Sequence, residues 1–147
     1  MNGYLLDTSV LSLLAPGKRL PGQALAAWMQ AHSATLYLSA VTVAEIEQGI
    51  CKLRRAGGVE RAAQLTRWLD GLIAQGEERI VPFDAHVGRI AGALSERATA
   101  SGRHPGFADV AIAATALARG WVVLTCNGKH FEPLGVNYVD PTEGLPD

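Results

Sequence analysis

Three acidic residues and one carboxamide stand where apolar runs of this sequence meet helical patterns. Asp7 comes directly after the run YLL, and Asn127 follows the run that ends in LTC. Glu45, in VTVAEIEQGI, and Asp109, in FADVAIAATALARG, are each expected in the first turn of a helix. Three converging carboxylates repel one another unless protons or a cation relieve them, and such hard oxygen ligands suit Mg²⁺ or Mn²⁺. The set therefore predicts a divalent-cation site able to bind phosphate oxygens.

Each of these residues also has an ordinary structural explanation when it is taken alone. Thr42 and Glu45 fit a capping box, with Thr42 as N-cap and Glu45 folding back on it. Asp7 could cap the helix that follows, Asp109 could favour a helix dipole, and Asn127 with the next glycine is a common turn dipeptide. A cap needs only one short polar residue, so three acids at one crevice favour the cation site.

The elements that must position these side chains are short strands alternating with helices. Runs typical of buried strands lie at Tyr4–Leu6, Leu36–Ser39, Ile80–Phe83, Trp121–Thr125 and Val136–Val139. Between the second and third runs, helical spacing predicts a hairpin of two helices over Thr42–Arg55 and Val59–Gln75. Because strands alternate with helices along the chain and the strands are apolar on both faces, the sequence predicts an α/β fold with a mostly parallel sheet between helices. In such sheets, sites lie outside the carboxyl ends of the strands, where the four polar residues fall.

Length and composition limit the class of protein. A chain of 147 residues, 48% hydrophobic and 18% charged, is expected to form one soluble globular domain over residues 1–147. Asp7 interrupts the first apolar stretch, and no basic segment precedes it, so neither a signal peptide nor a membrane span is predicted. Cys51 and Cys126 lack the spacing of a zinc site and suit a reducing, cytosolic setting. A net charge of -1 neither supports nor excludes a polyanionic ligand.

The ordered motifs YLLDTSV, VTVAEIEQGI, FADVAIAATALARG, TCNGKHF and VNYVDP resemble those of PIN-domain ribonucleases, in particular the VapC and FitB type of bacterial toxin. The resemblance covers nearly the whole chain, and the ordered set is specific although no single motif is. It implies a PIN-like three-layer α/β fold whose central parallel sheet has the strand order 3-2-1-4-5. It also implies an acidic site that binds Mg²⁺ or Mn²⁺ and cuts RNA, leaving 5′-phosphate and 3′-hydroxyl products.

The same resemblance implies roles for individual residues. The catalytic residues are expected to be Asp7, Glu45, Asp109 and Asn127, with the three acids as metal ligands and with Thr8 and Thr125 in support. A metal ion held by the acids would polarise a phosphoryl oxygen and acidify the attacking water. Any of the three carboxylates could take the proton from that water.

Two positions depart from the family pattern. Cys126 stands where many members have an arginine, so one expected basic contact is missing. Asn127 stands where many members have a fourth acid, which removes a charge that would help to bind a second metal ion. These departures favour one tightly held ion, with any second ion recruited by the substrate.

The resemblance further implies a partner. A cognate antitoxin similar to VapB or FitA is expected to neutralise the enzyme in the bacterial cytoplasm, in a homodimer or in a heterotetramer or larger assembly. The helical hairpin carries Ile46, Ile50 and Leu53, which predict an apolar groove suited to an amphipathic antitoxin helix.

Other functions remain possible from the sequence. A PIN-like module could bind RNA or protein without cutting. A HAD-type phosphatase also places an aspartate after its first strand, but its second aspartate would stand where this chain has Ser9. A response-regulator domain would need paired acids and a late lysine that are not well placed. Asp84, before a helix with an apolar face, is predicted to be an N-cap rather than a site residue.

Overall fold

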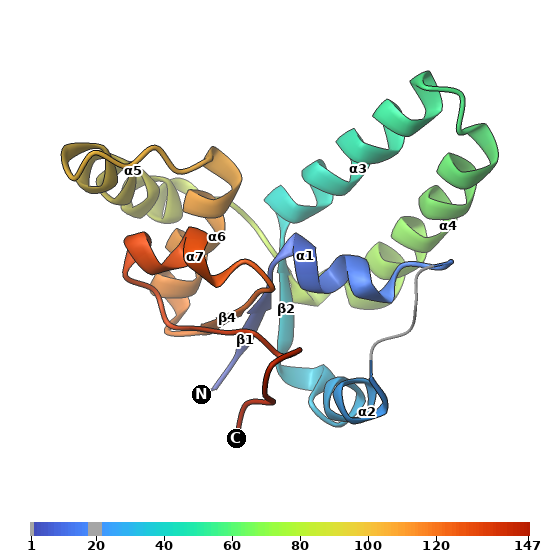
Figure 1. Cartoon of the computed structure of the whole chain (residues 1–147), viewed down its shortest axis with the longest axis horizontal. Helices are drawn as coiled ribbons and strands as arrows, with labels where there is room; N and C mark the ends of the chain where they lie inside the picture. Colours follow the sequence, from blue (N-terminus) through green and yellow to red (C-terminus); the bar gives the residue numbers. More distant parts are fainter. Residues whose placement is uncertain (1, 18–21) are drawn as a thin grey trace.

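The fold is built on a five-stranded sheet, seen in a computed structural model that describes residues 2–17 and 22–147. Its order is β3-β2-β1-β4-β5, and every neighbouring pair is parallel. The strands are β1 (Tyr4–Leu6), β2 (Leu36–Ser39), β3 (Ile80–Val81), β4 (Val122–Leu124) and β5 (Tyr138–Val139). Figure 1 shows β1 running through the middle of the molecule beside β2 and β4. The predicted parallel sheet and its strand order are confirmed.

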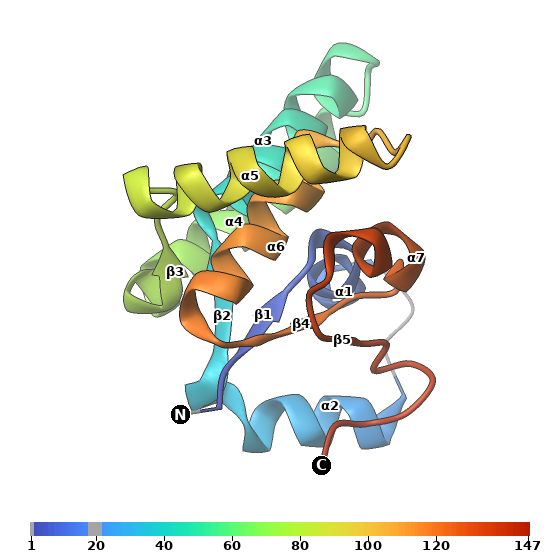
Figure 2. The ribbon, with the colours of Figure 1, turned by 90° about the vertical axis from the view of Figure 1, so that its left-hand side faces the viewer.

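Helices cover both faces of this sheet, which confirms the predicted three-layer arrangement (Figure 2). The α-helices are α1 (Thr8–Leu11), α2 (Gln23–Ala31), α3 (Ala40–Arg55), α4 (Val59–Gly76), α5 (Ala85–Ala100), α6 (Phe107–Arg119) and α7 (Gly128–Phe131). Short 3₁₀ turns are η1 (Ser12–Leu14), η2 (Ser33–Thr35), η3 (Glu77–Arg79) and η4 (Glu132–Leu134). The helices α5 and α6 pack over one face, and α1 and α2 pack over the other.

Successive residues of the two central strands point into opposite layers. Leu5 of β1 and Val123 of β4 belong to the cluster with α5 and α6, whereas Leu6 and Leu124 pack against α1 and α2. Side chains alternate along a strand, so a sheet covered on both sides needs apolar residues at every position. This packing fixes the ends of β1 and β4, and it thereby places the polar residues that follow them.

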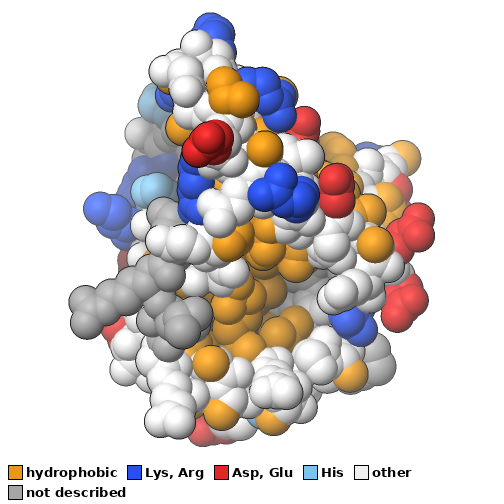
Figure 3. All heavy atoms as spheres, turned by 90° about the vertical axis from the view of Figure 1, so that its right-hand side faces the viewer, with side chains coloured by type: hydrophobic (Ala, Val, Ile, Leu, Met, Phe, Trp, Pro, Cys, Tyr) orange, Lys and Arg blue, Asp and Glu red, His pale blue; other side chains and the backbone are white. Residues whose placement is uncertain are grey.

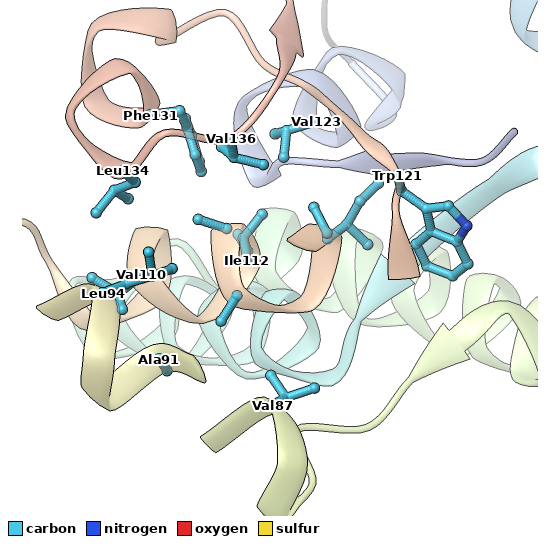
Figure 4. Packing of buried hydrophobic residues seen from close by; sticks show 14 of the residues in the cluster. Val87, Ala91, Leu94, Val110, Ile112, Trp121, Val123, Phe131, Leu134 and Val136 are labelled. Carbon is cyan, nitrogen blue, oxygen red and sulfur yellow. The ribbon is translucent and has the colours of Figure 1, made fainter. Parts of the chain in front are cut away.

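The middle of α6 is almost completely buried. All residues from Val110 to Ala116 are at most 3% exposed, and most of them are small. Their size lets α5 approach closely with Val87, Ala91 and Leu94, as Figure 4 shows. This packing of the middle of α6 places its first turn, which contains Asp109, relative to the sheet.

Helix α3 begins earlier than the sequence predicted, and this changes the role of two residues. Ser39 is the N-cap, and its Oγ accepts a hydrogen bond from the Val41 N–H at 3.0 Å. Thr42 therefore lies inside the helix, where its buried hydroxyl has no hydrogen-bond partner among the residues described. Glu45 lies beyond the first turn, which contains no acidic residue. The predicted capping box of Thr42 and Glu45 was wrong, because the last residue of β2 caps the helix instead.

The predicted apolar groove on the helical hairpin was also wrong. Ile50 is 1% exposed and packs against Ala62 and Leu69 of α4, and Ile46 and Leu53 pack against the same cluster. These side chains fill the space between α3 and α4. An apolar hollow of about 300 Å³ lies elsewhere, on the face seen in Figure 3, and is lined in part by Leu6, Leu11, Leu14, Met29, Leu36, Leu38 and Leu72.

The remaining boundaries differ from the predicted ones by a few residues. Strand β3 ends at Val81 because Pro82 has no N–H to donate to a neighbouring strand. Strands β4 and β5 are shorter than their apolar runs, and α3 and α4 match the predicted hairpin closely. The predicted N-cap is confirmed, since Asp84 Oδ1 accepts from the Val87 N–H at 2.9 Å. None of the helices described is both long and apolar enough to cross a membrane.

Candidate active site

The polar residues singled out by the sequence meet at the carboxyl ends of the two central strands. Asp7 directly follows β1, and its backbone N–H donates to Leu124 O of β4 at 2.9 Å. Thr125 directly follows β4. Helix α3 leaves the adjacent end of β2 and packs against α1 and α6 (Figure 1). The fold thereby brings Glu45 of α3 and Asp109 of α6 toward Asp7.

Asp7 is held by hydroxyl groups from both central strand ends. It is 5% exposed, and its Oδ2 accepts from Ser9 Oγ at 2.9 Å and from Thr125 Oγ1 at 2.8 Å. Each hydroxyl has one proton to donate, so both hydroxyls act as acceptors toward their other neighbours. Ser9 Oγ accepts from the Cys126 N–H at 3.0 Å, and Thr125 Oγ1 accepts from the Asn127 N–H at 2.9 Å. This network stabilises a nearly buried carboxylate and ties the loop after β4 to it.

Glu45 is positioned by the residue next to Asp7. Thr8 Oγ1 donates to Glu45 Oε1 at 2.7 Å. The bond joins the first residue of α1 to the second turn of α3. It holds the Glu45 carboxylate beside Thr8, the residue that follows Asp7.

The environment of Asp109 disfavours the charged form of its carboxyl group. Burial raises the pKa of its carboxyl above the usual range, and the charges of Asp7 and Glu45 raise it further, while His130 lowers it. The Nδ1 atom of His130 lies 3.4 Å from Asp109 Oδ2. The three carboxylates are therefore close enough to influence one another, and a positive charge near them would be stabilising.

Asn127 and Cys126 lie at the margin of this arrangement. Asn127 is exposed and is the N-cap of α7, but its side chain makes no capping hydrogen bond. Its backbone N–H, rather than its carboxamide, joins the network around Asp7. Burial raises the pKa of the Cys126 thiol, and the nearby Asp140 and Asp7 charges add to that rise. Cys126 thus brings no charge to the site.

Each of the three carboxylates keeps one oxygen free of protein hydrogen bonds within residues 2–17 and 22–147. The protein contacts are made by Asp7 Oδ2, Glu45 Oε1 and Asp109 Oδ2, so the other oxygen of each group is available to a ligand. Three such oxygens suit a hard divalent cation. The described side chains nevertheless include no group of three His, Cys, Asp or Glu residues already gathered closely enough to hold a metal. The three carboxylates have the chemistry that such an ion requires. Binding of the ion would have to bring them closer to one another.

Sequence reasoning missed two residues of the site. Ser9 belongs to the network around Asp7, and its position two residues after an aspartate is a spacing at which side chains commonly bond. His130 lies beside Asp109, and no sequence signal could have joined residues on two different helices. Both contacts depend on how the strand ends and α7 are placed in space.

Comparisons with known proteins identify the family of the chain. A family model described as "PIN domain" matches residues 4–135. The chain is 37% identical over 140 residues to "VapC ribonuclease Y4jK" of Sinorhizobium fredii, covering 95% of this chain and 97% of that protein. It is 31% identical over 138 residues to "Toxin FitB" of Neisseria gonorrhoeae, covering 93% of this chain and 96% of that protein.

Solved structures show the same likeness in three dimensions. The crystal structure of FitAcB from Neisseria gonorrhoeae matches with a TM-score of 0.78 and 31% identity, covering 94% of this chain and 97% of that chain. DNA-bound VapBC from Salmonella typhimurium matches in fold with a TM-score of 0.76 at 20% identity, covering 95% of this chain and 98% of that chain. Because the family match spans most of the chain and its relatives align over nearly their whole length, the chain belongs to the PIN-domain family.

Proposed function

We propose that this protein is a metal-dependent endoribonuclease that acts as a toxin. The observation that carries the proposal is the set of three carboxylates, each with one oxygen held by the protein and the other available. The chain's relatives named as a VapC ribonuclease and as a toxin support the substrate class and the biological role. Membership of the PIN-domain family leaves no reason to favour a HAD-type phosphatase or a response regulator.

In the proposed mechanism, Asp7, Glu45 and Asp109 would hold Mg²⁺ or Mn²⁺. When bound, the ion supplies a Lewis acid for a phosphoryl oxygen and acidifies the attacking water. Ser9 and Thr125 keep the Asp7 carboxylate in one orientation, and Thr8 does the same for Glu45. One of the acids accepts the proton of the water. Asn127 stays in the proposed catalytic set, at the exposed edge of the site where a substrate can reach its carboxamide.

The proposed setting is a toxin-antitoxin system. The solved relatives FitAcB and FitAB combine the FitB toxin with a second protein, which supports a cognate antitoxin for this chain. We propose that residues 1–147 form one PIN domain that pairs with a second copy and assembles with the antitoxin in the bacterial cytoplasm. Occupation of the carboxylate site by the antitoxin would prevent cleavage of RNA.

Cleavage of a synthetic single-stranded RNA tests the proposed function. The wild type should cut the RNA when Mg²⁺ or Mn²⁺ is added and should stop when the ion is chelated. Asp7→Asn should lower the rate by at least about a hundredfold, because it removes a charged ligand of the ion that would stabilise the transition state. Asp70→Asn is the matched control, because Asp70 is an exposed acid on α4 outside the site, and it should cut like the wild type. Metal-independent cleavage, or an active Asp7→Asn variant, would contradict the proposal.

A further inference from the structure

A hollow lined mainly by basic and imidazole side chains adjoins the acidic site. Its volume is about 290 Å³, and it lies between the connection from α5 to α6 and the short helix α7. Four basic or imidazole side chains line it, together with one acid of the candidate active site. The lining residues are Arg103, His104, Pro105, Gly106, Asp109, Lys129, His130 and Pro133. Asp109 therefore belongs both to the candidate active site and to the wall of this hollow, so the two sites are adjacent.

The two strongest cations of this hollow have no carboxylate partner. In the described parts of the chain, the only basic or imidazole nitrogen within 4.0 Å of a carboxylate oxygen is His130 Nδ1, which lies 3.4 Å from Asp109 Oδ2. Neither Arg103 nor Lys129 makes a side-chain hydrogen bond to those parts, and both residues are exposed. By contrast, Arg54 at the far end of the α3–α4 hairpin donates to Thr66 Oγ1 at 3.5 Å. The charges of Arg103 and Lys129 are thus not used to stabilise the fold.

The start of α6 adds further donors to the same hollow. Gly106 is the N-cap of this helix of 13 residues and provides no side-chain cap, and the first helical bond runs from the Val110 N–H to Gly106 O. The backbone N–H groups before Val110 therefore have no partner in the helix. A helix N-terminus favours a bound anion such as phosphate. Gly106 and Asp109 from this helix start line the hollow together with the basic side chains.

We propose that this hollow binds a phosphate of the RNA strand next to the phosphate that is cut, with Arg103 and Lys129 as its anchors. The inference rests on the proposed ribonuclease function. RNA carries one negative charge per nucleotide, so a phosphate placed at the acidic site brings its neighbours to the rim of that site. The acidic site repels those neighbours, and the adjacent basic hollow offsets the repulsion. Residues on two separate segments thereby fix the direction of the strand.

Binding of a labelled single-stranded RNA oligonucleotide, measured with chelator present so that no cleavage occurs, tests this inference. The double variant Arg103→Ala/Lys129→Ala should bind about tenfold more weakly than the wild type at 50 mM salt. The dependence of log K on log salt should become shallower by about 0.7 for each lost phosphate contact. The control Lys52→Ala/Arg67→Ala removes one lysine and one arginine from exposed positions on the hairpin, and it should bind like the wild type. Melting temperatures should show that both double variants remain folded.

Three results would overturn the inference. The first is an unchanged affinity and salt slope in the Arg103→Ala/Lys129→Ala variant. The second is an equal loss in the hairpin control, which would indicate an effect of net charge alone. The third is a wild type that does not bind RNA at 50 mM salt. Cleavage of the same RNA by the same wild-type preparation in Mg²⁺ distinguishes the two proposals, because activity without a role for the hollow leaves the nuclease function standing.

Discussion

Single residues of the candidate site differ in how the protein compensates their charge. Asp7 is nearly buried, and its Oδ2 accepts hydrogen bonds from the hydroxyl groups of Ser9 and Thr125. Asp109 has His130 at 3.4 Å, and burial together with the charges of Asp7 and Glu45 raises the pKa of its carboxyl. Asp109 is therefore the acid whose charge is least compensated by protein groups.

A change at Asp109 should reveal this imbalance in the stability of the metal-free protein. The pKa of Asp109 is higher in the folded than in the unfolded chain, so its contribution favours folding at acidic pH and is lost as the pH rises through the raised pKa. At pH 7 in chelator, Asp109→Asn should raise the melting temperature relative to the wild type, and the difference should shrink as the pH is lowered. The same variant should lose most of the stabilisation that Mg²⁺ gives the wild type by mass action.

The control for this prediction is Asp70→Asn, which should melt like the wild type in chelator and keep the response to Mg²⁺. A metal-free Asp109→Asn variant that is less stable than the wild type at pH 7 would show that the carboxylate stabilises the fold. A full Mg²⁺ response in that variant would show that Asp109 is not a ligand.

At the scale of elements, the starts of the helices separate structural acids from candidate catalytic ones. Helix α5 is capped by Asp84, and α3 is capped by Ser39, which leaves Glu45 free of any capping role. Glu45 is instead joined to α1 through Thr8. Two acids near helix starts, similar in sequence context, thus have different environments in the fold.

Glu45→Ala and Asp84→Ala should consequently have opposite effects. Asp84→Ala should lower the free energy of unfolding by about 1 kcal/mol, as loss of an N-cap usually does, and should leave the specific rate of RNA cleavage unchanged. Glu45→Ala should abolish cleavage and change the free energy of unfolding much less, because it removes a candidate ligand rather than a cap. Urea unfolding and the cleavage assay measure the two quantities. Retained turnover in Glu45→Ala would defeat its assignment as a metal ligand.

At the scale of the whole molecule, the parallel sheet gathers residues from both ends of the sequence at one edge. The order β3-β2-β1-β4-β5 places the amino-terminal strand beside β4, so Asp7 and Thr125 become neighbours although 118 positions separate them. The carboxylates and the basic hollow then lie next to each other through Asp109. In the proposed function, an RNA strand would meet the carboxylates through a bound divalent cation and the basic hollow directly.

The toxin role is testable in cells. Expression of the wild type in a bacterial host should arrest growth, because uncontrolled cleavage of RNA stops protein synthesis. Asp7→Asn should abolish the arrest, and co-expression of the small open reading frame next to the native gene should relieve it. Growth curves with matched expression levels measure both effects. Normal growth of cells that contain active enzyme, with no stable complex recovered from the native cell, would exclude the toxin role and leave the nuclease function intact.

The sequence by itself determined the layers of the fold and the residues worth examining. Apolar runs alternating with helical patterns predicted the parallel sheet, because a sheet covered on both faces requires apolar side chains at every strand position. The strand order was implied only by the resemblance of the ordered motifs to PIN-domain ribonucleases, whereas Asp84 was recognisable as a cap from its own neighbours. The apolar runs, the helical spacing and the N-cap each involve residues close together along the chain, so they can be recognised from the sequence.

Only the tertiary structure decided which polar groups contact one another. The hydrogen bonds from Ser9 and Thr125 to Asp7, the approach of His130 to Asp109 and the filling of the hairpin by Ile50 all depend on how distant segments pack. The capping box of Thr42 and Glu45 failed for the same reason, since the end of β2 placed Ser39 at the cap. Hydrogen bonds and burial are short-range in space and not along the chain, so spacing in the sequence could not determine them.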